Sequence, residues 1–173
     1  MAGFSRLSGA GRHRLLAGLA ALCLLLAAPA VAQTAKGEFP AGELEFVVPA
    51  KWNVEGGRQK VILVSPGEDA FVEFTLLQPG SENALKAQLG RRLSSTLTDT
   101  VLSDDGQSLK INGMPAVKVS GIGSSDATAV RFVALALAPT AKQPVMVLAY
   151  TAQDGFPDLQ PVFETLFASL NRR

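Results

Sequence analysis

The chain has 173 residues, of which 16 are basic and 15 acidic, with a single cysteine and a single histidine. This length suits one domain with a core large enough to fold without metals or cross-links. The charges nearly balance and form no basic cluster, which argues against nucleic-acid binding.

Residues 1–32 have the order of a cleaved secretory signal. Three arginines precede an apolar run over residues 15–28, and small residues follow it. The run is shorter than the roughly 20 apolar residues that a membrane-spanning helix needs. We predict a periplasmic protein cleaved after Ala32, which leaves Gln33 first and no membrane span. Cleavage after Ala30 is the alternative.

Two other fates of this segment are weaker. An uncleaved anchor conflicts with the short apolar run. A lipoprotein would need a small residue before Cys23, where the sequence has Leu22.

Removal of the signal would take His13 and Cys23 with it and leave 141 residues with 13 basic and 15 acidic side chains. Without imidazole or thiol, the domain cannot build a Ser-His-Asp or Cys-His site, a disulfide or the usual zinc site. We therefore predict no cofactor, no metal site and no enzymatic activity.

The first half of the mature chain predicts strands and then a helix. Residues 33–42 are polar and contain Gly and Pro, so we expect a flexible lead-in, followed by one domain over residues 43–173. Short apolar runs separated by turns predict a three-stranded meander over residues 44–48, 61–64 and 70–77. Ser81 is a candidate N-cap for a helix that ends near Thr98. Its leucines recur every four residues and predict a face packed on a sheet: Leu85, Leu89, Leu93 and Leu97.

A second group of strands and a final helix follow. Strands are expected over residues 100–103, 109–111, 117–119, 129–137 and 145–150, with a flexible turn at 121–125. The run 129–137 is nearly all apolar, as in a central strand covered on both faces. The last helix has apolar residues at helical spacing, and Pro161 is expected in its first turn, which places the start near Leu159.

These elements predict an α+β fold: an antiparallel sheet of about six to seven strands covered by two main helices in an α/β/α sandwich. Three short patterns then resemble the PsbP-like group, which includes DcrB-type envelope proteins and the Ran-binding Mog protein. They are Phe46-x-Val48-Pro49-x-x-Trp52-x-Val54, Ile111-Asn112-Gly113-x-x-Ala116 and Phe163-x-x-Leu166-x-x-Ser169-Leu170. The resemblance covers about residues 43–170 and implies a binding or assembly role rather than catalysis.

Few residues stand out as candidate sites. Trp52, the only tryptophan, is a candidate partner contact or a structural plug. Asp104 and Asp105 are also candidate partner contacts, and they suit a turn better than a calcium loop.

We predict a periplasmic, non-catalytic module that binds or helps assemble another envelope component, with an envelope protein as partner. One alternative is a carboxylate-dependent envelope glycan hydrolase that uses Glu43, Glu45 or Glu73. The other is a small-ligand carrier with an apolar pocket between sheet and helix.

Overall fold

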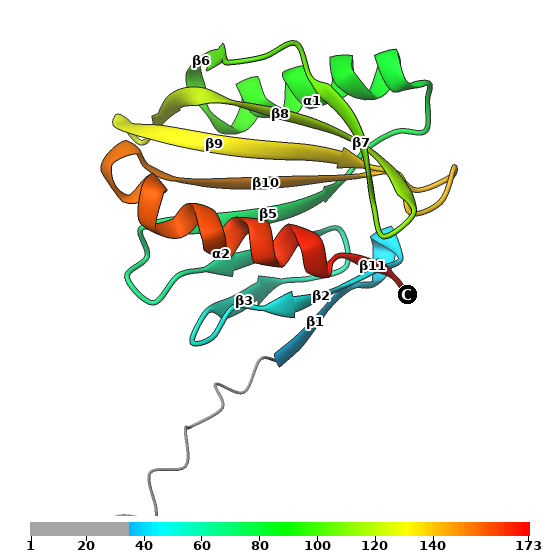
Figure 1. Cartoon of the computed structure of the whole chain (residues 1–173), viewed down its shortest axis with the longest axis horizontal. Coiled ribbons are helices and arrows are strands. Elements are labelled where there is room, and N and C mark those ends of the chain that lie inside the picture. The colour runs from blue at the N-terminus through cyan, green and yellow to red at the C-terminus, as the bar shows by residue number, and fades with distance from the viewer. Residues whose placement is uncertain (1–34) are drawn as a thin grey trace, which may run out of the picture. The chain divides into compact units, whose positions relative to one another are not determined.

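The structure of the protein, a computed structural model, describes residues 35–173. The predicted signal segment and its cleavage residues Ala30, Ala32 and Gln33 lie outside the described residues. The described part combines two antiparallel sheets and two α-helices (Figure 1), which is the α+β class that the sequence predicts.

The larger sheet has eight strands, all paired antiparallel. Seven of them follow the order β3-β4-β5-β10-β9-β8-β6, and β7 pairs with β8. Their bounds are β3 Asn53–Gly56, β4 Lys60–Val64, β5 Ala70–Leu76, β6 Thr98–Leu102, β7 Gln107–Ile111, β8 Met114–Ser125, β9 Thr128–Leu137 and β10 Val145–Ala152. The predicted count of six to seven strands is too low for this sheet, and β3 is a strand that was not predicted from the sequence.

A small second sheet lies on one face of the larger one. It consists of β1 (Ala35–Phe39), β2 (Leu44–Val48) and the two-residue β11 (Asn171–Arg172), in the order β1-β2-β11. The prediction of a flexible lead-in is therefore wrong for residues 35–42. Ala35 to Phe39 pair in register with β2, and the Phe39 side chain is fully buried. The strand at 44–48 likewise does not join the predicted meander, which β3, β4 and β5 form instead.

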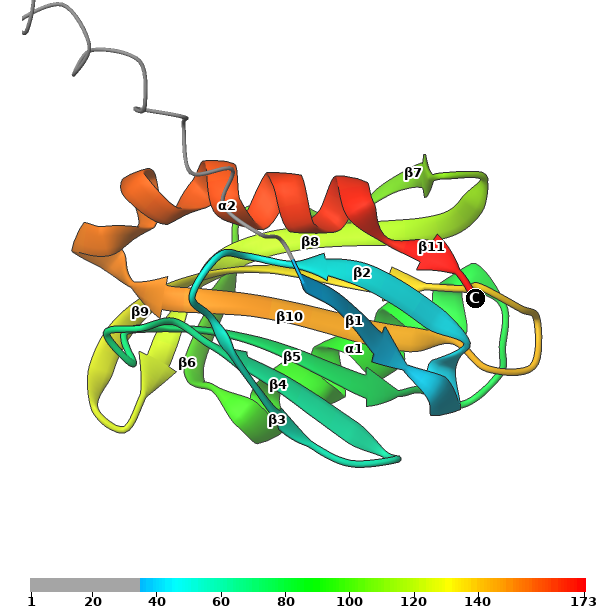
Figure 2. The same ribbon diagram turned by 90° about the horizontal axis from the view of Figure 1, so that it is seen from below.

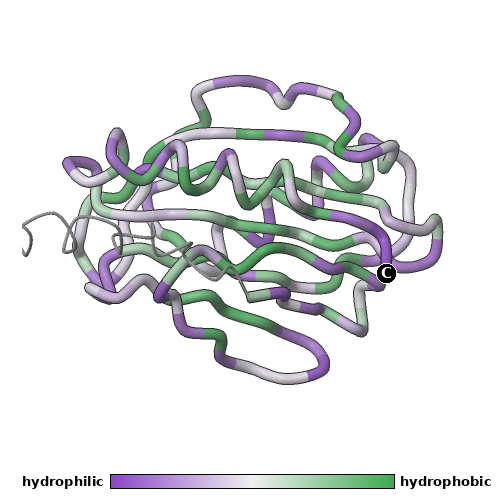
Figure 3. The backbone as a smooth tube through the Cα atoms, turned by 60° about the horizontal axis from the view of Figure 1, so that its bottom comes forward, coloured by the Kyte–Doolittle hydropathy of each residue, from purple (hydrophilic) through white to green (hydrophobic). Residues whose placement is uncertain are grey.

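The helices cover opposite faces of the larger sheet (Figure 2). Helix α1 (Glu82–Thr96) packs on one face through Leu85, Leu89 and Leu93. Helix α2 (Phe156–Ser169) and the small sheet share the other face. Each face of the larger sheet has its own hydrophobic core, and side chains of β10 alternate between the two. Val147 is in the core on the α2 side, and Leu148 is in the core on the α1 side. In Figure 3 hydrophobic residues follow the central strands, while many loops are hydrophilic.

Helix α1 agrees closely with its sequence pattern. The Ala84 N–H donates to the Ser81 hydroxyl at 3.4 Å, so Ser81 is the N-cap. The leucine row is buried, and Leu97 follows the last helical residue as the C-cap.

Two predicted boundaries are wrong. Helix α2 begins at Phe156 with Pro157 in its first turn, so Pro161 lies inside the helix. Residues 121–125 continue β8, and the turn is the next pair, Asp126 and Ala127, both with positive φ. Gly121 and Gly123 suggested a turn in the sequence. Gly121 is instead needed in the strand, because a Cβ there would collide with the Phe132 ring and the Val101 carbonyl.

Candidate binding groove at the strand ends

A groove opens where helix α1 stops short of the sheet that it covers. The helix has 15 residues and is about 22 Å long, whereas β8 has 12 residues and spans about 40 Å. The C-terminal end of α1 lies near Gly123 of β8, and Leu85 near its start lines the groove together with Val117. From Val117 toward its first residue, Met114, strand β8 therefore extends past the start of α1, and its face on that side of the sheet is open.

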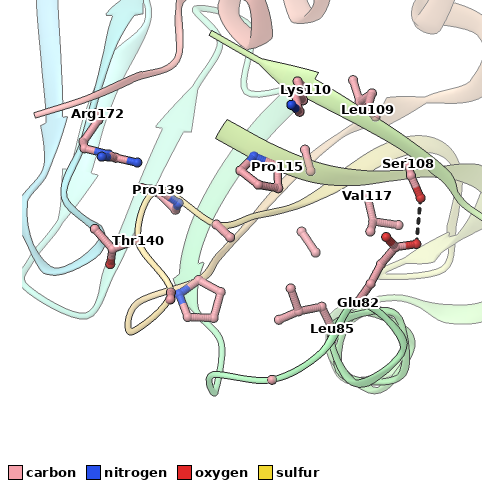
Figure 4. Close-up of a pocket in the computed structure, with 16 residues that line it drawn as sticks. Glu82, Leu85, Ser108, Leu109, Lys110, Pro115, Val117, Pro139, Thr140 and Arg172 are labelled. Atoms are coloured by element: carbon pink, nitrogen blue, oxygen red, sulfur yellow. Dashed lines mark hydrogen bonds between the residues drawn. The ribbon is translucent and has the colours of Figure 1, made fainter. Parts of the chain in front are cut away.

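This groove, called the strand-end groove below, has a volume of about 720 Å³. That volume is within the range of ligand-binding pockets. Five elements contribute: the start of α1, β7, β8, the end of β9 with the loop after it, and β11 (Figure 4). Its floor and walls are mainly apolar or small side chains, namely Leu85, Leu109, Pro115, Ala116, Val117, Ala136, Ala138, Pro139, Ala141 and Pro144.

The carboxylate of Glu82 lies at one end of this groove, where it is held by two partners. Its Oε1 accepts a hydrogen bond from the Ser108 hydroxyl at 2.7 Å and contacts the Lys86 Nζ at 3.2 Å. The Ser108 hydrogen bond, and then Lys86, lower the pKa of Glu82 below its usual value. Glu82 is therefore ionised at neutral pH and is unsuited to act as a general acid.

Two cations lie on the rim away from Glu82. Figure 4 shows Lys110 on β7 and Arg172 on β11, with Pro115 and Pro139 between them. Both side chains are exposed, and among residues 35–173 neither has an ion-pair partner within 4 Å. The groove thus pairs an apolar floor with positive charge at one end and a neutralised carboxylate at the other.

A second, smaller groove of about 310 Å³ runs beside helix α2 on the opposite face of the sheet. Arg131 lies over the Phe156 ring there, 5.4 Å from its centroid. Lys118 and Glu164 line it as well and also line an adjoining hollow of about 350 Å³. This surface mixes charges of both signs with aromatic rings and has less apolar floor than the strand-end groove.

None of the three predicted partner contacts lines either groove, although Asp104 and Trp52 contact Ser120 and Phe163, which line the second groove. Trp52 is half-buried and meets the Phe163 ring edge-on, with centroids 6.3 Å apart, which fits a structural plug. Asp104 accepts hydrogen bonds from the Gly106 N–H at 3.0 Å and the Ser120 hydroxyl at 2.8 Å, as a turn residue does. Asp105 is exposed beside it. Since Trp52 precedes edge strand β3 and the aspartates follow edge strand β6, the three residues do not form one site.

The three carboxylates considered for hydrolysis line none of these hollows. Glu45 is on the small sheet and forms an ion pair with Lys36 at 2.6 Å. Glu73 is on the α1-facing side of β5, is 7% exposed, and its Oε2 contacts the Lys60 Nζ at 2.8 Å. Glu43 is in a turn with φ of 51°. Glycosidase chemistry needs two carboxyl groups across one cleft, and these residues do not provide such a pair.

Two further observations concern residues 35–173 alone. In this part of the chain, no group of three or more His, Cys, Asp or Glu side chains is placed to hold a metal ion. No helix of this described part is long and apolar enough to cross a membrane.

Solved structures share this architecture. Cyanobacterial PsbP from Synechocystis sp. PCC 6803 superposes with a TM-score of 0.62 at 13% identity, over 84% of this chain and 96% of that chain. LpqN of Mycobacterium tuberculosis, described as involved in cell envelope biogenesis, gives 0.56 at 14% identity, over 80% and 84%. The Ran-binding protein Mog1p of Saccharomyces cerevisiae gives 0.56 at 10% identity, over 81% and 95%.

The chain has a PsbP/Mog1-like fold. The fold expected from the sequence resemblance is thereby confirmed. Neither a protein-family model nor a curated protein matches the sequence, so the likeness is one of fold.

The strand-end groove was missed by sequence reasoning. The sequence pattern that indicates it is weak. It consists of prolines and alanines at the ends of β8 and β9, together with Lys110 and Arg172, which lie in distant segments of the chain. Only the pairing of β7 with β8 and of β11 with β2 brings those segments to one rim.

Proposed function

We propose that this chain is an exported, non-catalytic binding module of the cell envelope, and that the strand-end groove is its binding site. The observation that carries the proposal is the open apolar floor beyond the end of α1, beside a carboxylate already engaged by Ser108 and Lys86. Such a site can bind an apolar surface or chain, but it offers no unengaged carboxylate for proton transfer.

Location in the envelope is supported by two independent features. Residues 1–32 have the charged, apolar and small-residue order of a secretory signal. LpqN, which has the same fold, is described as involved in cell envelope biogenesis.

A protein partner is supported by Mog1p, described as Ran-binding. The sequence patterns further favour kinship with the DcrB-type envelope proteins.

Asp105 is a secondary candidate contact. Its side chain is exposed, whereas Asp104 and Trp52 contact other residues of the fold. A partner seated in the strand-end groove would not need any of the three.

The test compares two matched tryptophan variants of the purified protein. Ala138→Trp places a large side chain in the groove, and Ala87→Trp places one on an exposed position of α1 that does not line it. Each protein is immobilised and exposed to detergent-solubilised envelope. We expect the wild type and Ala87→Trp to enrich the same component and Ala138→Trp to lose it. Equal enrichment by all three proteins, or turnover of an envelope glycan by the pure protein, would contradict the proposal.

A further inference from the structure

The strand-end groove combines two chemistries that few single ligands match. Its floor is formed by Leu85, Val117 and Ala136, which are almost fully buried beneath it. Its rim holds Lys110 and Arg172, two exposed cations without an ion-pair partner among the described residues. The opposite end holds Glu82, whose charge is offset by Lys86.

From this arrangement we propose that the groove binds a single-chain amphiphile with an anionic headgroup. The acyl chain lies along the apolar floor, and the headgroup lies between Lys110 and Arg172. The inference rests on the proposed function, since it names the ligand class of that same groove.

Charge complementarity selects this ligand over simpler ones. A purely apolar ligand would use the floor and gain nothing from the two cations. A small inorganic anion would meet the cations but leave the apolar floor in water, without the burial that supplies most binding energy. At the other end Lys86 is already paired with Glu82, so only the Lys110 and Arg172 end offers unpaired positive charge, and this difference sets the direction of the ligand.

The chain contribution is tested with three dissolved ligands, decanoate, octanoate and 1-decanol, titrated into the purified protein by calorimetry below their aggregation limits. We expect one decanoate per chain. Octanoate should bind about tenfold more weakly, because each methylene buried on the floor changes affinity by about three- to fourfold. Equal affinity of octanoate and decanoate would overturn the acyl-chain placement.

The headgroup contribution is tested with the double variant Lys110→Gln/Arg172→Gln. The matched control is Arg58→Gln/Arg92→Gln, which removes the same charge from exposed positions outside the groove. We expect the groove variant to bind decanoate about tenfold more weakly, at about threefold per exposed ionic contact, and to bind 1-decanol unchanged. Equal losses in the two double variants would show a general charge effect and overturn the headgroup site.

The source of the anionic amphiphile is tested with vesicles that contain phosphatidylglycerol. Binding to these vesicles without binding to dissolved decanoate would mean that the cations meet a lipid surface, and it would overturn the inference. Failure here is separable from failure of the proposed function. If decanoate does not bind while Ala138→Trp still abolishes capture of an envelope component, the groove remains a binding site and only the ligand class is wrong.

Discussion

The Ser108 hydroxyl donates a 2.7 Å hydrogen bond to Glu82 Oε1 and joins β7 to the first turn of α1. Because Glu82 and Ser108 both line the strand-end groove, this contact links two of its walls. It is the main reason that the pKa of Glu82 is lowered.

The first prediction follows from this hydrogen bond. Ser108→Ala should raise the pKa of Glu82 toward its ordinary value, since a donor to the charged form is lost. The side-chain carboxyl resonance, followed by NMR through an acid titration, measures the change. Because the folded pKa is lowered, this contact stabilises the fold above the unfolded pKa and is lost as pH falls through the folded one. Ser94→Ala, on the exposed side of α1, is the control. An unchanged Glu82 pKa in Ser108→Ala would refute the assignment.

Tyr150, the only tyrosine, permits a second prediction from ultraviolet absorption. It stacks on Phe71 with centroids 5.3 Å apart. Burial, and then the charge of Glu73, raise its pKa above the usual value near 10. Phenolate absorption should therefore appear at higher pH than for a free tyrosine. The raised pKa means that this contribution to stability is complete below the unfolded pKa and is lost as pH rises through the folded one.

Glu73→Gln separates the two causes of that shift. The Tyr150 pKa should fall in this variant but stay above the usual value, since burial is the larger cause. A normal Tyr150 pKa in the wild-type protein would contradict the stacked, half-buried position.

Two glycines predict opposite effects on stability. Gly90 lies inside α1, and a Cβ there would meet nothing within 4 Å. Gly90→Ala should therefore raise the free energy of unfolding by about 0.5–1 kcal/mol, because alanine loses less conformational entropy in a helix. The melting temperature, followed through Trp52 fluorescence, should rise by about 2–5 °C.

Gly121→Ala should act in the other direction. Its Cβ would collide with the Phe132 ring and the Val101 carbonyl, so β6, β8 and β9 would have to shift. We expect a loss of about 1–3 kcal/mol, as for other overpacked sites. A neutral result would mean that β6 is not held against β8 as described.

The elements that sequence predicted best are those whose pattern is local. The spacing of the leucines in α1 and the apolar run of β9 are enough to predict which residues are buried. Ser81 indicates a helix start because its hydroxyl can accept a hydrogen bond from the first turn. Where pairing partners are distant, prediction failed. Residues 35–39 form a strand because they pair with β2, and Gly121 belongs in a strand because Phe132 and β6 lie against it. The groove is the extreme case, since it depends on the relative lengths of α1 and β8.

Export gives a further prediction. The mature protein recovered from the envelope should begin at Gln33, or at Val31 if cleavage follows Ala30, as read from its intact mass. Arginine at both Ala30 and Ala32 should block cleavage, because the peptidase needs small residues there. A mature mass that includes residues 1–32 in the wild type would show that the segment is an anchor.

Binding in the strand-end groove is tested most directly by mapping amide chemical shifts of the labelled protein as decanoate is added. The account predicts saturable shifts at Leu85, Ser108, Val117 and Ala138, with the amides of Arg131 and Gln160 in the second groove unmoved. Shifts that gather at Arg131 and Gln160 instead, or that spread evenly without saturation, would contradict it.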